Sequence, residues 1–165
     1  MTKRILLIED DTVLRENTAE LLELSGYEVR TAANGSKVIQ KSKEYLPDVI
    51  VCDIMMPEID GYGVLEILSQ EPSTKSIPFI FLSAKTERRD VRKGMELGAD
   101  DYITKPFSES ELIGATESRL AKMAILQETV FNKNSGMGAA SPESRITSIH
   151  QLKSFIDDNG QEFSY

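Results

Sequence analysis

Carboxylates gather at two points of the sequence, each directly after a short apolar run. Glu9, Asp10 and Asp11 follow apolar residues 5–8, and Asp53 follows apolar residues 49–52. Crowded carboxylates repel one another, and a hard divalent cation relieves that repulsion. Mg²⁺ binds a few carboxylates together with water and a phosphate oxygen. The spacing is therefore compatible with a cation site that also binds a phosphate, but each acidic cluster alone is more typical of a solvated loop.

Two further polar signals follow later apolar runs. Ser83-Ala84 comes after residues 79–82, and Lys105-Pro106 comes after Tyr102-Ile103. A serine hydroxyl can donate to one phosphoryl oxygen, and a lysine ammonium can neutralise another. The Lys105–Pro106 bond is also a candidate cis peptide bond, because proline makes that form accessible. Alone, each is an ordinary surface residue; with the carboxylates they indicate one phosphoryl-binding rim.

The elements that must position these residues alternate along the chain. Five short runs rich in apolar or β-branched residues predict strands, and three of them are continuously apolar, which is typical of parallel strands covered on both faces. Stretches with helical spacing lie between and after them, at about 12–25, 38–45, 64–68, 91–97 and 112–123. This alternation predicts an α/β domain with a parallel sheet. The carboxyl ends of parallel strands form one edge, where ligands bind.

Composition narrows the class of protein. The chain has 165 residues, a formal net charge of −8 and a single cysteine, Cys52. The net charge is unfavourable for binding a phosphate backbone, so we expect no direct contact with nucleic acid. One cysteine excludes an internal disulfide framework. The sequence shows neither a leader peptide nor a membrane-spanning run, and we expect a cytoplasmic protein with no membrane partner.

The sequence divides into three parts. Residues 3–122 predict the α/β domain, and residues 123–143 predict an extension of the last helix followed by a linker, because 132–142 are small and polar. Residues 144–165 predict a tail with a short helix. Its apolar stripe would consist of Ile149, Leu152, Phe155 and Ile156.

Four motifs together resemble the receiver domain of bacterial two-component response regulators. They are ILLIEDD, the DIMMPEIDG run that begins at Asp53, the Ser-Ala pair after FIFL, and GADDYITKPF. They occur in family order and spacing and cover roughly residues 3–122. The resemblance implies a CheY-like, flavodoxin-like fold: a five-stranded parallel sheet of order 2-1-3-4-5 flanked by five helices. The short helical tail would be an addition to it.

The resemblance also implies the composition of a metal site. Glu9 and Asp10 match the acidic pair that holds Mg²⁺, and Asp53 with the backbone carbonyl of Met55 completes the protein ligands. Asp11 is a third acid at the rim and ranks below that pair. Mg²⁺ is accordingly the expected cofactor.

The remaining roles concern the phosphoryl group and the switch. The resemblance implies that Asp53 is the nucleophile that forms an aspartyl phosphate. Ser83 and Lys105 match the residues that contact the phosphoryl group. Ser83 and Tyr102 match a switch pair, in which the hydroxyl moves toward the phosphoryl group and the ring turns inward. The alternative for Tyr102 is a half-buried strand tyrosine.

The implied function is a phosphorylation-dependent switch, not a conventional enzyme, with self-phosphorylation and autophosphatase activity. A sensor histidine kinase would donate, and the face formed by the fourth helix, fifth strand and fifth helix would act on a downstream protein or output domain. We expect a single-domain regulator that signals by protein contact. The alternative is the receiver portion of a longer regulator with a DNA-binding transcriptional output beyond residue 165.

A phosphorylation-dependent homodimer is a further partner to consider. The sequence is closest to the OmpR/PhoB-type receivers, which dimerise through that same face. The branch carries cations where this chain has Val91, Ala115 and Glu117. Asp100, Asp101 and Glu111 would then lack partners across a two-fold axis, which is unfavourable for that dimer.

Overall fold

Strands and helices alternate along the chain in the computed structural model, which describes the backbone of residues 2–135 and the side chains of residues 2–128. The strands are β1 (Arg4–Ile8), β2 (Glu28–Ala32), β3 (Val49–Cys52), β4 (Phe79–Ser83) and β5 (Asp101–Thr104). The helices are α1 (Thr12–Leu24), α2 (Val38–Tyr45), α3 (Gly61–Gln70), α4 (Arg88–Glu96) and α5 (Glu109–Ser135), with a 3₁₀ turn, Gly35–Lys37, before α2. The described residues therefore contain the predicted strand–helix alternation.

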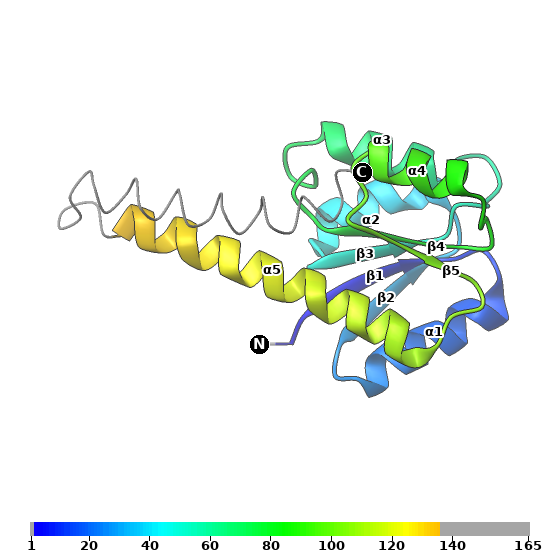
Figure 1. Ribbon diagram of the computed structural model, residues 1–165, viewed down its shortest axis with the longest axis horizontal. Helices are drawn as coiled ribbons and strands as arrows, with labels where there is room; N and C mark the ends of the chain where they lie inside the picture. Colours follow the sequence, from blue (N-terminus) through cyan, green and yellow to red (C-terminus); the bar gives the residue numbers. More distant parts are fainter. Residues whose placement is uncertain (1, 136–165) are drawn as a thin grey trace. The chain divides into compact units, whose positions relative to one another are not determined.

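The five strands form one parallel sheet in the order β2-β1-β3-β4-β5 (Figure 1). This confirms the fold predicted from the sequence. The second strand was predicted at residues 27–30 but lies at Glu28–Ala32. It is an edge strand whose side chains are only partly buried, so its apolar pattern marks its ends poorly.

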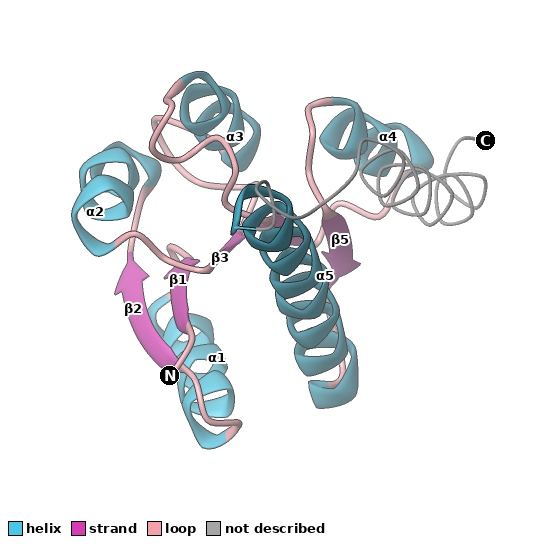
Figure 2. Cartoon of the chain, turned by 90° about the vertical axis from the view of Figure 1, so that its left-hand side faces the viewer, coloured by secondary structure: helices cyan, strands magenta, loops and turns pink. Residues whose placement is uncertain are grey.

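Two helical layers cover the sheet (Figure 2). One core combines Leu6, Ile50 and Phe81 of the strands with Leu65 and Leu68 of α3, on the face that also carries α2 and α4. The other combines inward residues of the same strands with residues of α1 and α5, among them Ile5, Val51, Leu82, Leu22 and Leu112. Burial on both faces explains the continuously apolar strands.

Helix α5 continues to Ser135, four residues into the stretch 132–142 predicted as a linker. The predicted tail helix, with its stripe from Ile149 to Ile156, lies outside the described residues. Within residues 2–135, no helix has both the length and the apolar character needed to cross a membrane.

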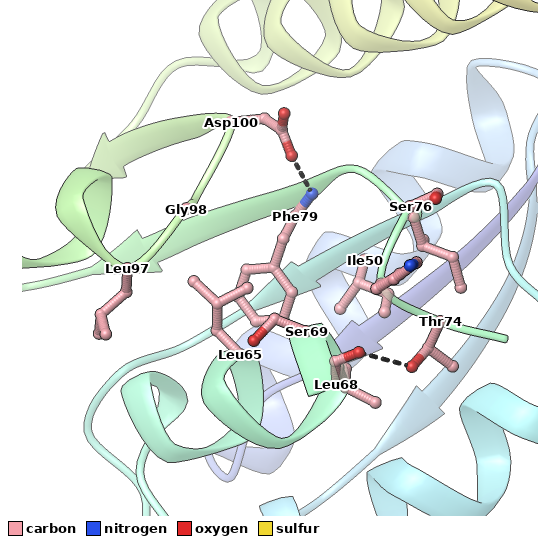
Figure 3. Close-up of a pocket in the computed structure, with 12 residues that line it drawn as sticks. Ile50, Leu65, Leu68, Ser69, Thr74, Ser76, Phe79, Leu97, Gly98 and Asp100 are labelled. Atoms are coloured by element: carbon pink, nitrogen blue, oxygen red, sulfur yellow. Dashed lines mark hydrogen bonds between the residues drawn. The ribbon is translucent and has the colours of Figure 1, made fainter. Parts of the chain in front are cut away.

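A cavity of about 240 Å³ lies near the amino ends of β3 and β4 (Figure 3). Phe79 and Ile50 contribute to its apolar lining. Asp100 stands at its rim and accepts a hydrogen bond from the Phe79 backbone N–H at 2.8 Å. Thr74 donates to the Leu68 carbonyl at 2.8 Å. No motif in the sequence marks this cavity, and its lining includes none of Glu9, Asp10 and Asp53.

Candidate acidic site

Three carboxylates converge at the carboxyl ends of β1 and β3, which are neighbours in the sheet. One oxygen from each of Glu9, Asp10 and Asp53 lies within 4.8 Å of the others. Glu9 is 2% exposed and Asp53 is 4% exposed, whereas Asp10 faces solvent. Three hard oxygen donors with an open side fit a small divalent cation that keeps water in its shell. The predicted cluster is therefore assembled by the fold.

Lys105 brings a cation to the same point from the end of β5. Its Nζ lies 2.9 Å from Glu9 Oε2 and 3.5 Å from Asp53 Oδ1. The Lys105 backbone N–H donates to the Ser83 carbonyl at 2.8 Å, which fixes the lysine beside β4. The Lys105–Pro106 bond is cis, as predicted. One ammonium group thus serves two buried carboxylates.

The electrostatics of the cluster are unfavourable for ionised carboxylates. Burial raises the pKa of Glu9 above its ordinary value; Lys105 opposes that shift and Asp53 adds to it. Burial also raises the pKa of Asp53, which Lys105 and the Met55 N–H oppose. A bound cation would favour the ionised forms of both carboxyls.

The loop after Asp53 is shaped around the carboxylate. The Met55 backbone N–H donates to Asp53 Oδ1 at 3.3 Å, while the Met55 side chain is exposed. Asp60 caps α3 by accepting from the Gly63 N–H at 2.8 Å. A Cβ on Gly61 would clash with the Asp53 carbonyl oxygen, so the first residue of α3 must be glycine-sized. This packing explains the glycine of the Asp60-Gly61 pair, which ends the DIMMPEIDG motif.

Ser83 and Tyr102 lie beside the cluster on β4 and β5. Ser83 is fully buried, and its Oγ accepts a hydrogen bond from the Lys85 N–H at 3.1 Å. The Tyr102 hydroxyl donates to the Lys85 carbonyl at 2.7 Å, and its ring centroid lies 5.9 Å from that of Phe81. Both predicted switch residues therefore contact the loop between β4 and α4.

Two residues near the cluster act differently from the sequence expectation. Asp11, ranked third among the acids, caps α1 by accepting from the Leu14 N–H at 3.0 Å and is not part of the cluster. Arg15, which sequence reasoning missed, donates from Nη1 to the Glu9 carbonyl at 2.9 Å. It lies six positions after Glu9, one helical turn into α1. No feature of the sequence marks this arginine among nineteen Lys and Arg residues.

The three acids on the face through which OmpR/PhoB-type receivers dimerise each accept hydrogen bonds within their own chain. Asp100 accepts from Phe79 N, Asp101 accepts from Tyr102 N at 2.8 Å, and Glu111 accepts from the Ser108 hydroxyl at 3.1 Å. Capping and turn-closing are alternatives to ion pairing for such acids. Their presence in the sequence therefore does not require partners on a second copy.

A parallel five-stranded sheet of order 2-1-3-4-5, with clustered acids and a lysine at its carboxyl edge, places the domain in the flavodoxin-like α/β class. The family model described as "Response regulator receiver domain" matches residues 5–117. The chain belongs to this family, and it contains the receiver domain of a two-component response regulator.

Relatives with known names support the same placement. The "Probable transcriptional regulator ycf27" of Pyropia yezoensis is 33% identical over 98% of this chain and 67% of its own length. The "Alkaline phosphatase synthesis transcriptional regulatory protein PhoP" of Bacillus subtilis is 39% identical over 83% of this chain and 56% of its own. A crystal structure described as that of a "putative response regulator" from Chloroflexus aurantiacus is 36% identical, with a TM-score of 0.71 over 73% of this chain and 99% of that chain.

Proposed function

We propose that Asp53 accepts a phosphoryl group from a sensor histidine kinase, and that Glu9, Asp10, Asp53 and the Met55 carbonyl hold Mg²⁺ during the transfer. The observation that carries this proposal is the convergence of three carboxylates and the Lys105 ammonium in one cluster, in which Glu9 and Asp53 are buried and Asp10 faces solvent. The domain then acts as a phosphoacceptor with self-phosphorylation and autophosphatase activity, not as a conventional enzyme.

The residues of this chain divide the work of the transfer. An Asp53 carboxylate oxygen attacks phosphorus; the new O–P bond forms as the bond to the donor nitrogen breaks, and that nitrogen leaves with the electron pair and takes up a proton. Lys105, now shared by Glu9 and Asp53, neutralises one phosphoryl oxygen. The Ser83 hydroxyl donates to another. Mg²⁺, when bound, would supply charge neutralisation for the carboxylates and the phosphoryl oxygens.

The switch follows from the position of the loop between β4 and α4. Ser83 and Tyr102 both bond to Lys85 in this loop. Recruiting the Ser83 hydroxyl to a phosphoryl oxygen favours the arrangement of this loop in which the Tyr102 hydroxyl is bonded to the Lys85 carbonyl. A local change of charge thereby biases the position of α4 and the adjoining face.

Phosphoryl uptake from a small-molecule phosphodonor tests the proposal. We expect one phosphoryl group per chain, measured by intact mass, in the presence of Mg²⁺ and none after chelation. Asp53→Asn abolishes uptake because it removes the nucleophile. Asp48→Asn is the matched control, since Asp48 is the acid immediately before the same strand and accepts from the Arg4 N–H. Uptake by Asp53→Asn at the wild-type level would overturn the assignment.

The output of the switch has two candidates. One is a single-domain regulator that signals by protein contact. The other is control of a transcriptional output, favoured by the named relatives, which are transcriptional regulators of which this chain spans 67% and 56% in the two cases above. Light scattering with Mg²⁺ and beryllofluoride separates them: a monomer in both states favours protein contact, and a dimer on activation favours the transcriptional type.

A further inference from the structure

Two tyrosine hydroxyls from different elements hold the segment that begins α4. The Tyr62 hydroxyl, on α3, donates to the Asp90 carbonyl at 3.0 Å. The Tyr102 hydroxyl, on β5, donates to the Lys85 carbonyl at 2.7 Å. Lys85 Nζ also lies 3.9 Å from Asp90 Oδ1, which joins the two accepting residues. The segment that begins α4 therefore accepts hydrogen bonds from two phenolic hydroxyls, one on α3 and one on β5.

The rings of these tyrosines belong to one aromatic row. Tyr62 packs edge-on against Phe81, with centroids 5.4 Å apart, and Phe81 packs against Tyr102 at 5.9 Å. Gly94 of α4 lies directly over the row: a Cβ there would come within 3.0 Å of Phe81 and 3.2 Å of Tyr102. Close-packed interiors change between discrete arrangements and do not deform continuously. Movement of the Tyr102 ring therefore requires both α4 and the Phe81 ring to shift.

Tyr62 is built to remain a hydrogen-bond donor. It is 5% exposed, and the Lys93 ammonium lies 4.5 Å from its ring centroid, within cation–π range. Burial, with Tyr102 and Asp90 nearby, raises the pKa of Tyr62 to about 12. The hydroxyl is protonated throughout the physiological pH range.

We propose that Tyr62 is a positioning residue of the switch, whose hydroxyl holds the first turn of α4 in the arrangement in which Tyr102 is bonded to Lys85. This rests on the proposed function, because it assumes that phosphorylation favours that arrangement. Linkage then requires that losing the Tyr62 hydroxyl weakens binding of a phosphoryl mimic at Asp53, although Tyr62 itself does not touch the acidic cluster. The Tyr62 hydroxyl thus determines how strongly binding at Asp53 is coupled to the arrangement of α4.

Tyr62→Phe tests this inference because it removes one hydroxyl and keeps the ring against Phe81. The probe is beryllofluoride with saturating Mg²⁺, titrated into the full chain and followed by the amide NMR signals of α4. We expect the dissociation constant of beryllofluoride to rise about 2- to 10-fold, the range that one neutral hydrogen bond gives. The α4 amide signals of the bound variant should also stop short of the wild-type bound positions.

Tyr45→Phe is the matched control. Tyr45 is equally buried, at 4% exposure, and its hydroxyl donates to the Glu28 carbonyl at 3.3 Å, far along the sheet from α4. It loses the same group, so any general loss of stability is shared, but its dissociation constant should match the wild type. Equal behaviour of the two variants would overturn the role of Tyr62. Failure of the wild type to bind beryllofluoride would instead overturn the proposed phosphoacceptor function.

Discussion

Asp53 and Glu9 are nearly inaccessible carboxylates that share the ammonium group of Lys105. Their raised pKa values mean that the folded protein holds their negative charge at a cost. Repulsion between the carboxylates destabilises the folded site, and a cation bound on the solvent-exposed side of Asp10 would reduce that repulsion. The free energy of unfolding should therefore depend on whether these carboxyl groups are charged and on whether a cation is bound.

Without divalent metal, we expect Asp53→Asn to raise the free energy of unfolding at neutral pH by on the order of 1 kcal/mol, because a buried charge and its repulsion from Asp10 are removed. With Mg²⁺ the order should reverse, since the wild type gains binding energy that the variant lacks. Urea unfolding with and without Mg²⁺ measures both. A metal-free variant less stable than the wild type would contradict the electrostatic argument.

Tyr62 should be visible in an alkaline titration. Its pKa is raised from 10.0 to about 12, so the stability linked to its proton is fully present below pH 10 and is lost as the pH rises toward 12. Among the five tyrosines of the chain, Tyr62→Phe should remove phenolate absorbance that appears near pH 12. Disappearance of a phenolate that titrates near pH 10 would show that Tyr62 is not shielded in solution.

Residue types at strand ends were enough to predict the acidic cluster, because parallel strands leave their carboxyl ends at one edge. Residue types alone could not separate Asp11 from Asp10, which only the family resemblance ranked, since capping depends on backbone geometry at the start of α1. Nor could residue types identify Tyr62 or Arg15. Their partners are backbone carbonyls, which every residue carries and which leave no mark on the sequence.

At the scale of elements, apolar periodicity predicted all five strands and five helices of the described residues. The predicted boundaries were accurate for β3, whose four residues are fully buried. They were shifted for β2, an edge strand whose residues are mostly exposed or partly buried. The end of α5 was also misplaced, because small polar residues 132–135 continue a helix that composition alone would stop. Boundaries are set by hydrogen bonds and packing more than by composition.

In α4, replacing a glycine with alanine should destabilise the protein, although that substitution usually stabilises a helix. Gly94→Ala gains helix propensity but places a methyl group against Phe81 and Tyr102, so we expect a lower free energy of unfolding by about 1–2 kcal/mol. Gly114→Ala is the control, since its Cβ in α5 meets no atom within 4 Å; it should raise the free energy of unfolding by about 0.5–1 kcal/mol. Urea denaturation measures the free energy of unfolding of both variants. A Gly94→Ala variant more stable than the wild type would show that the rings of Phe81 and Tyr102 move aside at little cost.

At the scale of the whole molecule, the receiver carries its own core. Both apolar clusters are formed by residues between Ile5 and Leu120, one on each side of the sheet. We expect removal of residues 136–165 to leave the cooperative thermal transition unchanged, measured by circular dichroism. A broadened transition or a loss of cooperativity would show that those residues contribute to the core.

The ion pair between Lys105 and Glu9 joins residues 96 positions apart in the chain. Such a contact forms only after the intervening strands have paired, because its loop-closure entropy must first be offset by other contacts. During synthesis, Glu9, which directly follows β1, leaves the ribosome long before Lys105, its partner in the ion pair. A partly synthesised domain contains Glu9 and Asp53 without Lys105, so the acidic cluster gains its ammonium group only when the edge strand β5 has docked.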